Sequence, residues 1–296
     1  MGAALLVLGT AVPGVWLAGS WDQTTMVGSP SVVQTVATAT ETPSATGTPS
    51  ATLSYDDSPV ATPTPATLTV SLADLGVTGT VAVAVYDLTT GTQLTAGSGK
   101  FETASVVKVD ILVALLLKQN GSLTTSQRAL AREMITESDN DAATALFQAV
   151  GSASGLNALN ARLGLVETTA GTNGNWGLTT TTAADQLRLL RLIYQPSALL
   201  SAASQAYVTS LMTDVDDDQD WGVSAADEDL TGYAIKDGWL QRTTTGLWDV
   251  TSIGSVQSAG VDLLVVVLVN KAKTMSAGIT TIESAARTAV QLVLAA

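Results

Sequence analysis

Ser105 and Lys108 form the S-x-x-K pattern, which occurs once in the sequence. If Ser105 opens a helix, Lys108 lies one turn later on the same helix face. A serine at a helix N-terminus, where negative charge is stabilised, can act as a nucleophile when a nearby lysine accepts its proton. The simpler interpretation is an N-cap serine followed by an ordinary lysine. Against it, the surrounding stretch VVKVDILVALLLKQ is apolar nearly all round, and a buried ammonium needs a partner or a function.

Two further tripeptides carry groups that could act on a substrate. Residues 138–140 are Ser-Asp-Asn, just ahead of a helical pattern, and residues 236–238 are Lys-Asp-Gly, after a strand pattern. The first could be simple helix capping, and the second a strand end entering a turn. If Lys236 lies near Lys108, each lysine lowers the pKa of the other, so Lys108 could be neutral part of the time and act as a base.

The chain contains neither histidine nor cysteine. This excludes disulfides, thiol nucleophiles, Cys/His zinc sites and a Ser-His-Asp triad. A serine nucleophile must therefore be activated by lysine, aspartate, glutamate or a water that one of them holds. We expect no metal and no cofactor. Residues 214–220, DVDDDQD, begin like a calcium loop, but Gln219 and Ala225 stand where that loop needs glycine and glutamate. We interpret them as a solvated acidic loop.

Composition limits the partners. The chain has 296 residues, 46% of them hydrophobic, and a mean hydropathy of +0.32, which suffices to bury a substantial core. Its 13 basic and 26 acidic residues give a net charge of −13. Such a field disfavours nucleic acid and membrane binding through basic patches. We expect a small-molecule substrate, no nucleic acid and a monomeric protein.

Three segments differ in composition. Residues 1–20 are uncharged and mostly apolar, which predicts an export signal or membrane anchor, although no basic residue precedes the apolar run; a buried helix is the alternative. Residues 21–67 are rich in Thr, Ser, Pro and Ala and predict a disordered linker. Residues 68–296 form the predicted catalytic domain. We therefore expect an extracytoplasmic protein, secreted or membrane-anchored at the cell wall.

Hydrophobic patterns predict the elements of that domain. Strands are expected over residues 80–88, 232–236, 247–254 and 261–270. Helices are expected over residues 105–119, 126–136, 141–150, 155–163, 183–194, 202–213 and 276–294. Strands at both ends with helices between them predict an α/β (α+β) fold, in which an antiparallel β-sheet is flanked by helices and carries an inserted all-helical subdomain.

The three patterns, in this order, are similar to the S-x-x-K, S-D-N and K-T-G set of serine β-lactamases and penicillin-binding proteins. Longer stretches resemble class A β-lactamases. FETASVVKVDILVALL resembles the nucleophile helix of these enzymes, and MITESDNDAATALFQAVG resembles their second motif with the helix after it. KDGWL resembles their K-T-G strand. The resemblance runs from about Leu68 to the C-terminus and implies a β-lactamase/transpeptidase-like fold.

The resemblance also implies roles. Ser105 attacks the acyl carbon of a β-lactam or acyl-D-amino acid, and Lys108 helps to remove its proton. Ser138 relays a proton towards the leaving nitrogen, and Lys236 keeps the site positive. Asn140 binds the amide side chain of the substrate. The residues implied in substrate binding are Asn140, Asp237, Gly238 and Trp239.

The strand around residue 237 departs from the family pattern. By resemblance, the oxyanion lies between the backbone N–H groups of Ser105 and Trp239. Asp237 stands where the family has Thr or Ser in contact with the substrate carboxylate. A carboxylate there would repel that group unless Lys236 or Arg242 pairs with it, so the substrate need not be a penicillin.

The loop after Leu165 is a second departure. It reads VETTAGTNGNWGLTTTT and lacks the E-x-x-L-N motif whose glutamate activates the deacylating water in class A β-lactamases. Glu167 is the only acidic residue between Asp141 and Asp185 and is the candidate deacylation base; a solvated loop carboxylate is the alternative.

Three functions remain open on these grounds. The first is a serine hydrolase that β-lactams acylate at Ser105 and that hydrolyses the acyl-enzyme slowly. The second is a D-alanyl-D-alanine peptidase or penicillin-binding protein. The third is a catalytically silent wall-binding module of the same fold.

Overall fold

The computed structural model describes residues 65–230 and 232–296. All of them belong to one compact unit, Val60–Ala296. The predicted export segment, residues 1–20, and residues 21–64 of the predicted linker lie outside the described residues. The first described strand, β1 (Thr67–Val70), begins one residue before the expected start of the catalytic domain.

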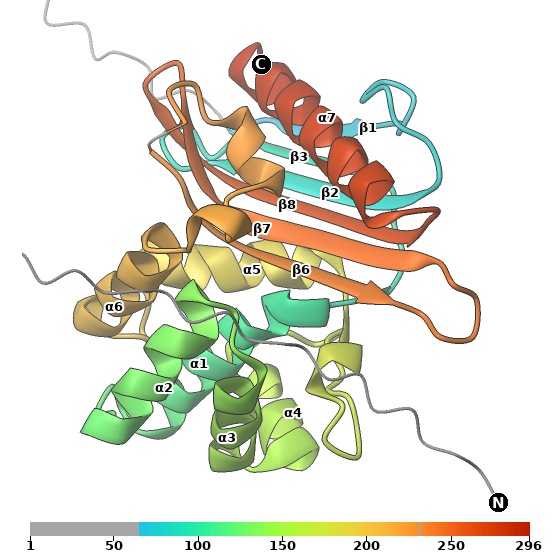
Figure 1. Ribbon diagram of the computed structural model, residues 1–296. Helices are drawn as coiled ribbons and strands as arrows, with labels where there is room; N and C mark the ends of the chain where they lie inside the picture. Colours follow the sequence, from blue (N-terminus) through green and yellow to red (C-terminus); the bar gives the residue numbers. More distant parts are fainter. Residues whose placement is uncertain (1–64, 231) are drawn as a thin grey trace, which may run out of the picture. The chain divides into compact units, whose positions relative to one another are not determined.

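A six-stranded sheet forms the centre of the unit, in the spatial order β1-β3-β2-β8-β7-β6 (Figure 1). Its remaining strands are β2 (Thr80–Asp87), β3 (Gln93–Ala96), β6 (Ala234–Gln241), β7 (Trp248–Ser258) and β8 (Val261–Ala272). Strand β2, from the start of the domain, pairs with β8 from its end, with Val83 opposite Val267. This pairing closes the domain around the helices inserted between the two strands.

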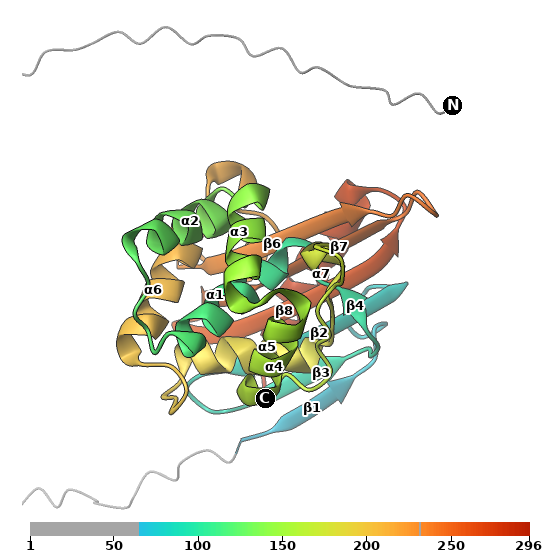
Figure 2. The ribbon, with the colours of Figure 1, turned by 90° about the horizontal axis from the view of Figure 1, so that it is seen from below.

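Seven helices are described. They are α1 (Val107–Lys118), α2 (Thr125–Thr136), α3 (Asn140–Val150), α4 (Ser152–Leu163), α5 (Ala183–Tyr194), α6 (Ala202–Thr213) and α7 (Met275–Leu294). Helix α7 covers one face of the sheet, and the other six helices lie on the opposite side (Figures 1 and 2). None of the described helices is long and apolar enough to cross a membrane.

The two faces of the sheet carry separate cores. Alternate side chains of β8 enter them: Leu264 and Val266 pack with the helices α1–α6, whereas Val265 and Val267 pack with α7. Because both faces are covered, β8 is apolar without interruption over its central residues, as expected for a doubly covered strand.

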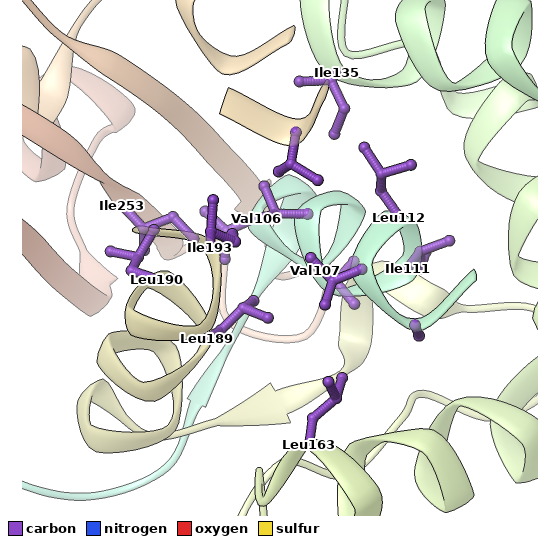
Figure 3. Close-up of a cluster of buried hydrophobic side chains, with 14 of the residues drawn as sticks. Val106, Val107, Ile111, Leu112, Ile135, Leu163, Leu189, Leu190, Ile193 and Ile253 are labelled. Carbon is purple, nitrogen blue, oxygen red and sulfur yellow. The ribbon is translucent and has the colours of Figure 1, made fainter. Parts of the chain in front are cut away.

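Helix α1 is the centre of the helical layer. Every residue from Val107 to Leu117 is buried, so its apolar side chains face neighbours all round. Figure 3 shows Val107 and Ile111 of α1 in the same cluster as Leu190 of α5 and Ile253 of β7. The helix that carries Lys108 is thus fixed between the sheet and the other helices.

The predicted α/β fold is confirmed, with three differences in detail. The sheet is antiparallel except where β1 runs parallel to β3. These two strands have four residues each, too few for a clear periodicity. Strand β6 continues to Gln241, so Lys236 and Gly238 lie inside a strand rather than at its end, because pairing with β7 overrides the weak strand propensity of Asp and Gly. A short second sheet, β4 (Phe101–Glu102) with β5 (Thr180–Thr181), was not predicted.

Candidate active site

Ser105 lies in a tight turn between β4 and α1. The turn is a single 3-10 segment, Ala104–Val106, and Ala104 has the left-handed backbone angle φ = 44°. A non-glycine residue in this region costs about 1 kcal/mol, so other contacts must hold the turn. One of them is the hydrogen bond that Thr251 Oγ1 on β7 donates to the Thr103 carbonyl, at 2.8 Å. The sheet therefore fixes the position of Ser105.

Gly238 lets strand β6 approach this turn closely. A Cβ atom on Gly238 would lie 2.5 Å from the Ser105 backbone nitrogen and 2.9 Å from the Thr103 carbonyl oxygen, nearer than any side chain tolerates. The absence of a side chain at residue 238 thus brings the backbone preceding Trp239 against the backbone of Ser105. This is the arrangement that an oxyanion site shared by those two amides requires.

Lys108 is fully buried, and its hydrogen bonds all end near the start of α3. Its Nζ donates to the Ser138 carbonyl oxygen at 2.5 Å, to Ser138 Oγ at 3.0 Å and to Asn140 Oδ1 at 2.9 Å. The ring of Trp176 lies 5.0 Å away, within cation–π range. The first two sequence motifs therefore meet at this ammonium, which answers why a lysine stands in an apolar helix.

The local structure at residues 138–140 serves this contact. Ser138 has φ = 55°, and Asp139 caps α3 by accepting a hydrogen bond from the Ala142 backbone N–H at 2.7 Å. The cap and the left-handed turn together direct the Ser138 hydroxyl and the Asn140 amide towards Lys108. Residue 139 thus has the capping role that its type suggests.

Burial changes the basicity of both lysines. The pKa of Lys108 is lowered to about 7, first by burial and second by the positive charge of Lys236, against a smaller raising effect of Asp139. The pKa of Lys236 is lowered to about 8 by burial, against the charges of Asp237 and Asp218. Desolvation, rather than mutual repulsion of the lysines, is the larger cause. A fraction of Lys108 is therefore neutral near pH 7 and can accept a proton.

A cavity of about 280 Å³ opens over Ser105. Its lining residues are Ala104, Ser105, Glu137, Ser138, Asn140, Trp176, Gly177, Gln219, Trp239 and Leu240. Four residues implied by the sequence resemblance, Ser105, Ser138, Asn140 and Trp239, thus share one cavity. The Ser105 hydroxyl makes no hydrogen bond within the described part of the chain.

Asp237 does not line this cavity. Its cross-strand partner is Ser252, and strand alternation puts both on the face opposite Lys236. There Asp237 Oδ1 lies beneath Gly222, where a Cβ atom would be 3.0 Å from it. Burial raises the pKa of Asp237 well above its usual value, against the lowering effects of Ser252 and Lys236. The expected repulsion of a substrate carboxylate by Asp237 therefore has no basis in this geometry.

Glu167 also lies outside the cavity of Ser105. It is exposed and borders a different cavity, of about 290 Å³, together with Lys100 and Thr182. Its backbone N–H donates to Asp185 Oδ2 at 2.8 Å. The structure does not bring this candidate deacylation base to Ser105.

Three other cavity residues were not singled out from the sequence. The 3-10 turn Trp176–Leu178 carries Trp176 to Lys108, and the Trp176 indole donates to Thr144 Oγ1 at 3.1 Å. In the sequence, the feature that could have identified Trp176 is that it is a single tryptophan within a polar loop. Glu137 directly precedes Ser138, whereas Gln219 was visible only as a break in a calcium-loop pattern. Within the described ranges, no cluster of Asp and Glu could hold a metal ion.

The family model described as the beta-lactamase enzyme family matches residues 116–293. The chain belongs to this family. The matched range begins after Ser105 and Lys108, so the roles of these two residues depend on the geometry above. No curated protein matches the sequence.

Solved structures of similar fold agree with this assignment. A class A β-lactamase of Bacteroides cellulosilyticus is 19% identical with a TM-score of 0.61, and the match covers 73% of this chain and 92% of that one. A β-lactamase of Chitinophaga pinensis is 20% identical with a TM-score of 0.63, over 76% and 96% of the two chains. A variant of PBP-A, solved as an acyl-enzyme complex with penicillin G, is 21% identical with a TM-score of 0.61, over 73% and 91%. At these identities the likeness concerns the fold.

Proposed function

We propose that the protein is a serine hydrolase that β-lactams acylate at Ser105. The observation that carries this proposal is the set of hydrogen bonds around Lys108. Among the described residues, its buried ammonium donates hydrogen bonds only to Ser138 and Asn140, beside a cavity that Ser105 and Ser138 both line. Membership of the beta-lactamase enzyme family supports the same reaction class.

The proposed acylation starts from neutral Lys108. The Ser105 oxygen attacks the carbonyl carbon and forms a new C–O bond, while its proton passes to Lys108. The electron pair of the carbonyl moves to its oxygen, which the backbone N–H groups of Ser105 and Trp239 stabilise. When the C–N bond breaks, Lys108 returns the proton through the Ser138 hydroxyl, 3.0 Å away, to the leaving nitrogen, and the acyl group stays on Ser105. Lys236 keeps the local potential positive.

We further propose that the acyl-enzyme is hydrolysed slowly. In the loop after Leu165, Trp176 places its ring 5.0 Å from Lys108, and Glu167 borders another cavity. An indole cannot take a proton from water, so this wall offers no general base for deacylation.

The test is a fluorescent penicillin and a chromogenic cephalosporin. We expect covalent labelling that is lost in Ser105→Ala, and a burst of product close to one equivalent followed by slow turnover. Rapid multiple turnover would refute slow deacylation. No labelling at about millimolar reagent, a level at which even weak binding of roughly −4 kcal/mol is populated, would favour the silent wall-binding module instead.

A D-alanyl-D-alanine peptidase is the second candidate, and the same observation favours it. An acyl-enzyme whose hydrolysis lacks a general base persists long enough to react with another acceptor. Release of D-alanine from a wall peptide by the wild-type protein, but not by Ser105→Ala, would select this activity over β-lactam hydrolysis.

The location of the protein also remains a proposal. The apolar residues 1–20 and the Thr/Ser/Pro/Ala-rich residues 21–67 support export and attachment at the cell wall, with possible membrane anchoring. Recovery of the protein only from the cytoplasm after cell fractionation would overturn it.

A further inference from the structure

The acidic segment 214–220 lies beside the cavity of Ser105. The Asp216 backbone N–H donates to the Thr136 carbonyl at 3.0 Å, directly before Glu137, and Arg132 pairs with Asp214 at 3.6 Å. Within this segment, Gln219 belongs to the cavity lining and the three aspartates before it are exposed. We call Glu137 together with Asp216, Asp217 and Asp218 the acidic rim.

No lysine or arginine is among the described residues that line this cavity. Of the described lining residues, Glu137 is the only charged one. Lys108 and Lys236 are fully buried, and Lys108 already makes three hydrogen bonds to protein atoms. At the acidic rim, an anionic acyl side chain would therefore be repelled, whereas a cationic one would be attracted.

Gln219 provides a second, independent indication. Its side chain is 6% exposed, it lines the cavity, and its amide oxygen has no hydrogen-bond partner among the described residues. A buried polar atom without a partner is costly, and an amide oxygen can be satisfied only by a donor. Trp239, whose ring lies 5.8 Å from that of Trp221, adds an aromatic wall of the kind that favours cations.

We propose that the site selects substrates whose acyl side chain carries a positive charge, an ammonium or guanidinium group, which Glu137 and Gln219 bind. The carboxylate of Glu137 supplies the charge and the amide oxygen of Gln219 accepts one N–H. The proposal rests on the proposed function, because the substrate must acylate Ser105 for the selection to be measured.

Three penicillins test it on the full-length protein. They share a phenylacetyl side chain and carry hydrogen, an ammonium group or a carboxylate on its α-carbon. The second-order rate constant of acylation, followed by intact-mass spectrometry, should be highest for the ammonium compound and lowest for the carboxylate. We expect steps of about two- to fivefold at low salt, the size of a solvent-accessible ion pair, and smaller steps at high salt.

Two variants assign the effect. Glu137→Gln should narrow the differences in acylation rate constant between the three compounds. Glu133 is an exposed glutamate one turn earlier on α2, and Glu133→Gln should leave these differences unchanged. Equal rates for all three compounds with the wild-type protein, or equal narrowing by both variants, would overturn the proposal while leaving acylation at Ser105 intact. Failure of all three to acylate Ser105 would instead refute the proposed function, and this inference with it.

Discussion

Lys108 makes most of the contacts in the candidate site, through its ammonium group. Burial lowers the pKa of Lys108 to about 7, so the neutral and charged forms are both populated near neutral pH. The charged form donates to Ser138 and Asn140, and the neutral form has a lone pair for the Ser105 proton. A single side chain can therefore hold the site together and act as its base.

Acylation should depend on the deprotonation of Lys108. Because the neutral form is the base, we expect the acylation rate constant to rise with pH and to level off above the pKa of about 7. Lys108→Arg should lower the rate by roughly 10²- to 10⁴-fold at every pH, since arginine keeps the charge but does not deprotonate. The check is a pH profile of β-lactam labelling for both proteins; a variant that retains the wild-type profile contradicts the assignment of the base.

Much of the site was predictable at the residue scale, because its first motif depends on residues that are close together in the sequence. Ser105 and Lys108 stand one helical turn apart, so their spacing could be interpreted without tertiary structure. Trp176 and Gln219 reach the cavity only through loops whose path depends on distant packing, and no spacing rule identifies them. The side of the strand on which Asp237 lies likewise depends on the register of β6 with β7.

At the scale of elements, the contact between β6 and the turn of Ser105 determines the geometry of the proposed oxyanion site. Strand β6 lies at the edge of the sheet, paired with β7 only, and it reaches the turn through Gly238. The helix and strand patterns of the sequence predicted most elements, because long periodic segments carry the clearest signal. The short strands β1, β4 and β5 were missed for the opposite reason.

Gly238→Ala tests this contact. The new methyl group would lie 2.5 Å from the Ser105 nitrogen, so β6 and the turn must separate. We expect at least a tenfold loss of acylation rate and about 1–3 kcal/mol of destabilisation. Gly254→Ala on β7 is the matched control, because its methyl group would crowd the Ala234 carbonyl at 2.3 Å, away from Ser105. If both variants lose stability and acylation alike at a temperature where both are folded, the contact has no specific role.

At the scale of the whole molecule, a buried acid links stability to pH. Asp110 on α1 is fully buried, and Asn160 Nδ2 on α4 donates to its Oδ2 at 3.0 Å. Burial raises the pKa of Asp110 to about 7. The other two oxygens of the pair, Asp110 Oδ1 and Asn160 Oδ1, have no hydrogen-bond partners among the described residues. When Asp110 is protonated, its Oδ1–H can donate to the amide oxygen of Asn160.

The sign of the effect follows from the raised pKa. Asp110 is protonated in the folded protein and ionised in the unfolded chain between about pH 4 and pH 7, so the free energy of unfolding should fall as pH rises through this window. Asp110 alone would account for at most about 4 kcal/mol. Urea denaturation at several pH values should show a smaller slope for Asp110→Asn. The exposed Asp229→Asn is the control, and an unchanged slope in Asp110→Asn would reject the assignment.

The contact between Gly238 and Ser105 joins segments of the chain that are synthesised at different times. Ser105 and its helix are made early in synthesis, whereas β6 belongs to the C-terminal part of the chain and forms its contact with the nucleophile only when the sheet is complete. A growing or unfolded chain therefore holds the serine without the strand that would complete the oxyanion site. If the proposed function holds, competence for acyl transfer appears only with the last steps of folding, and the growing chain is unreactive.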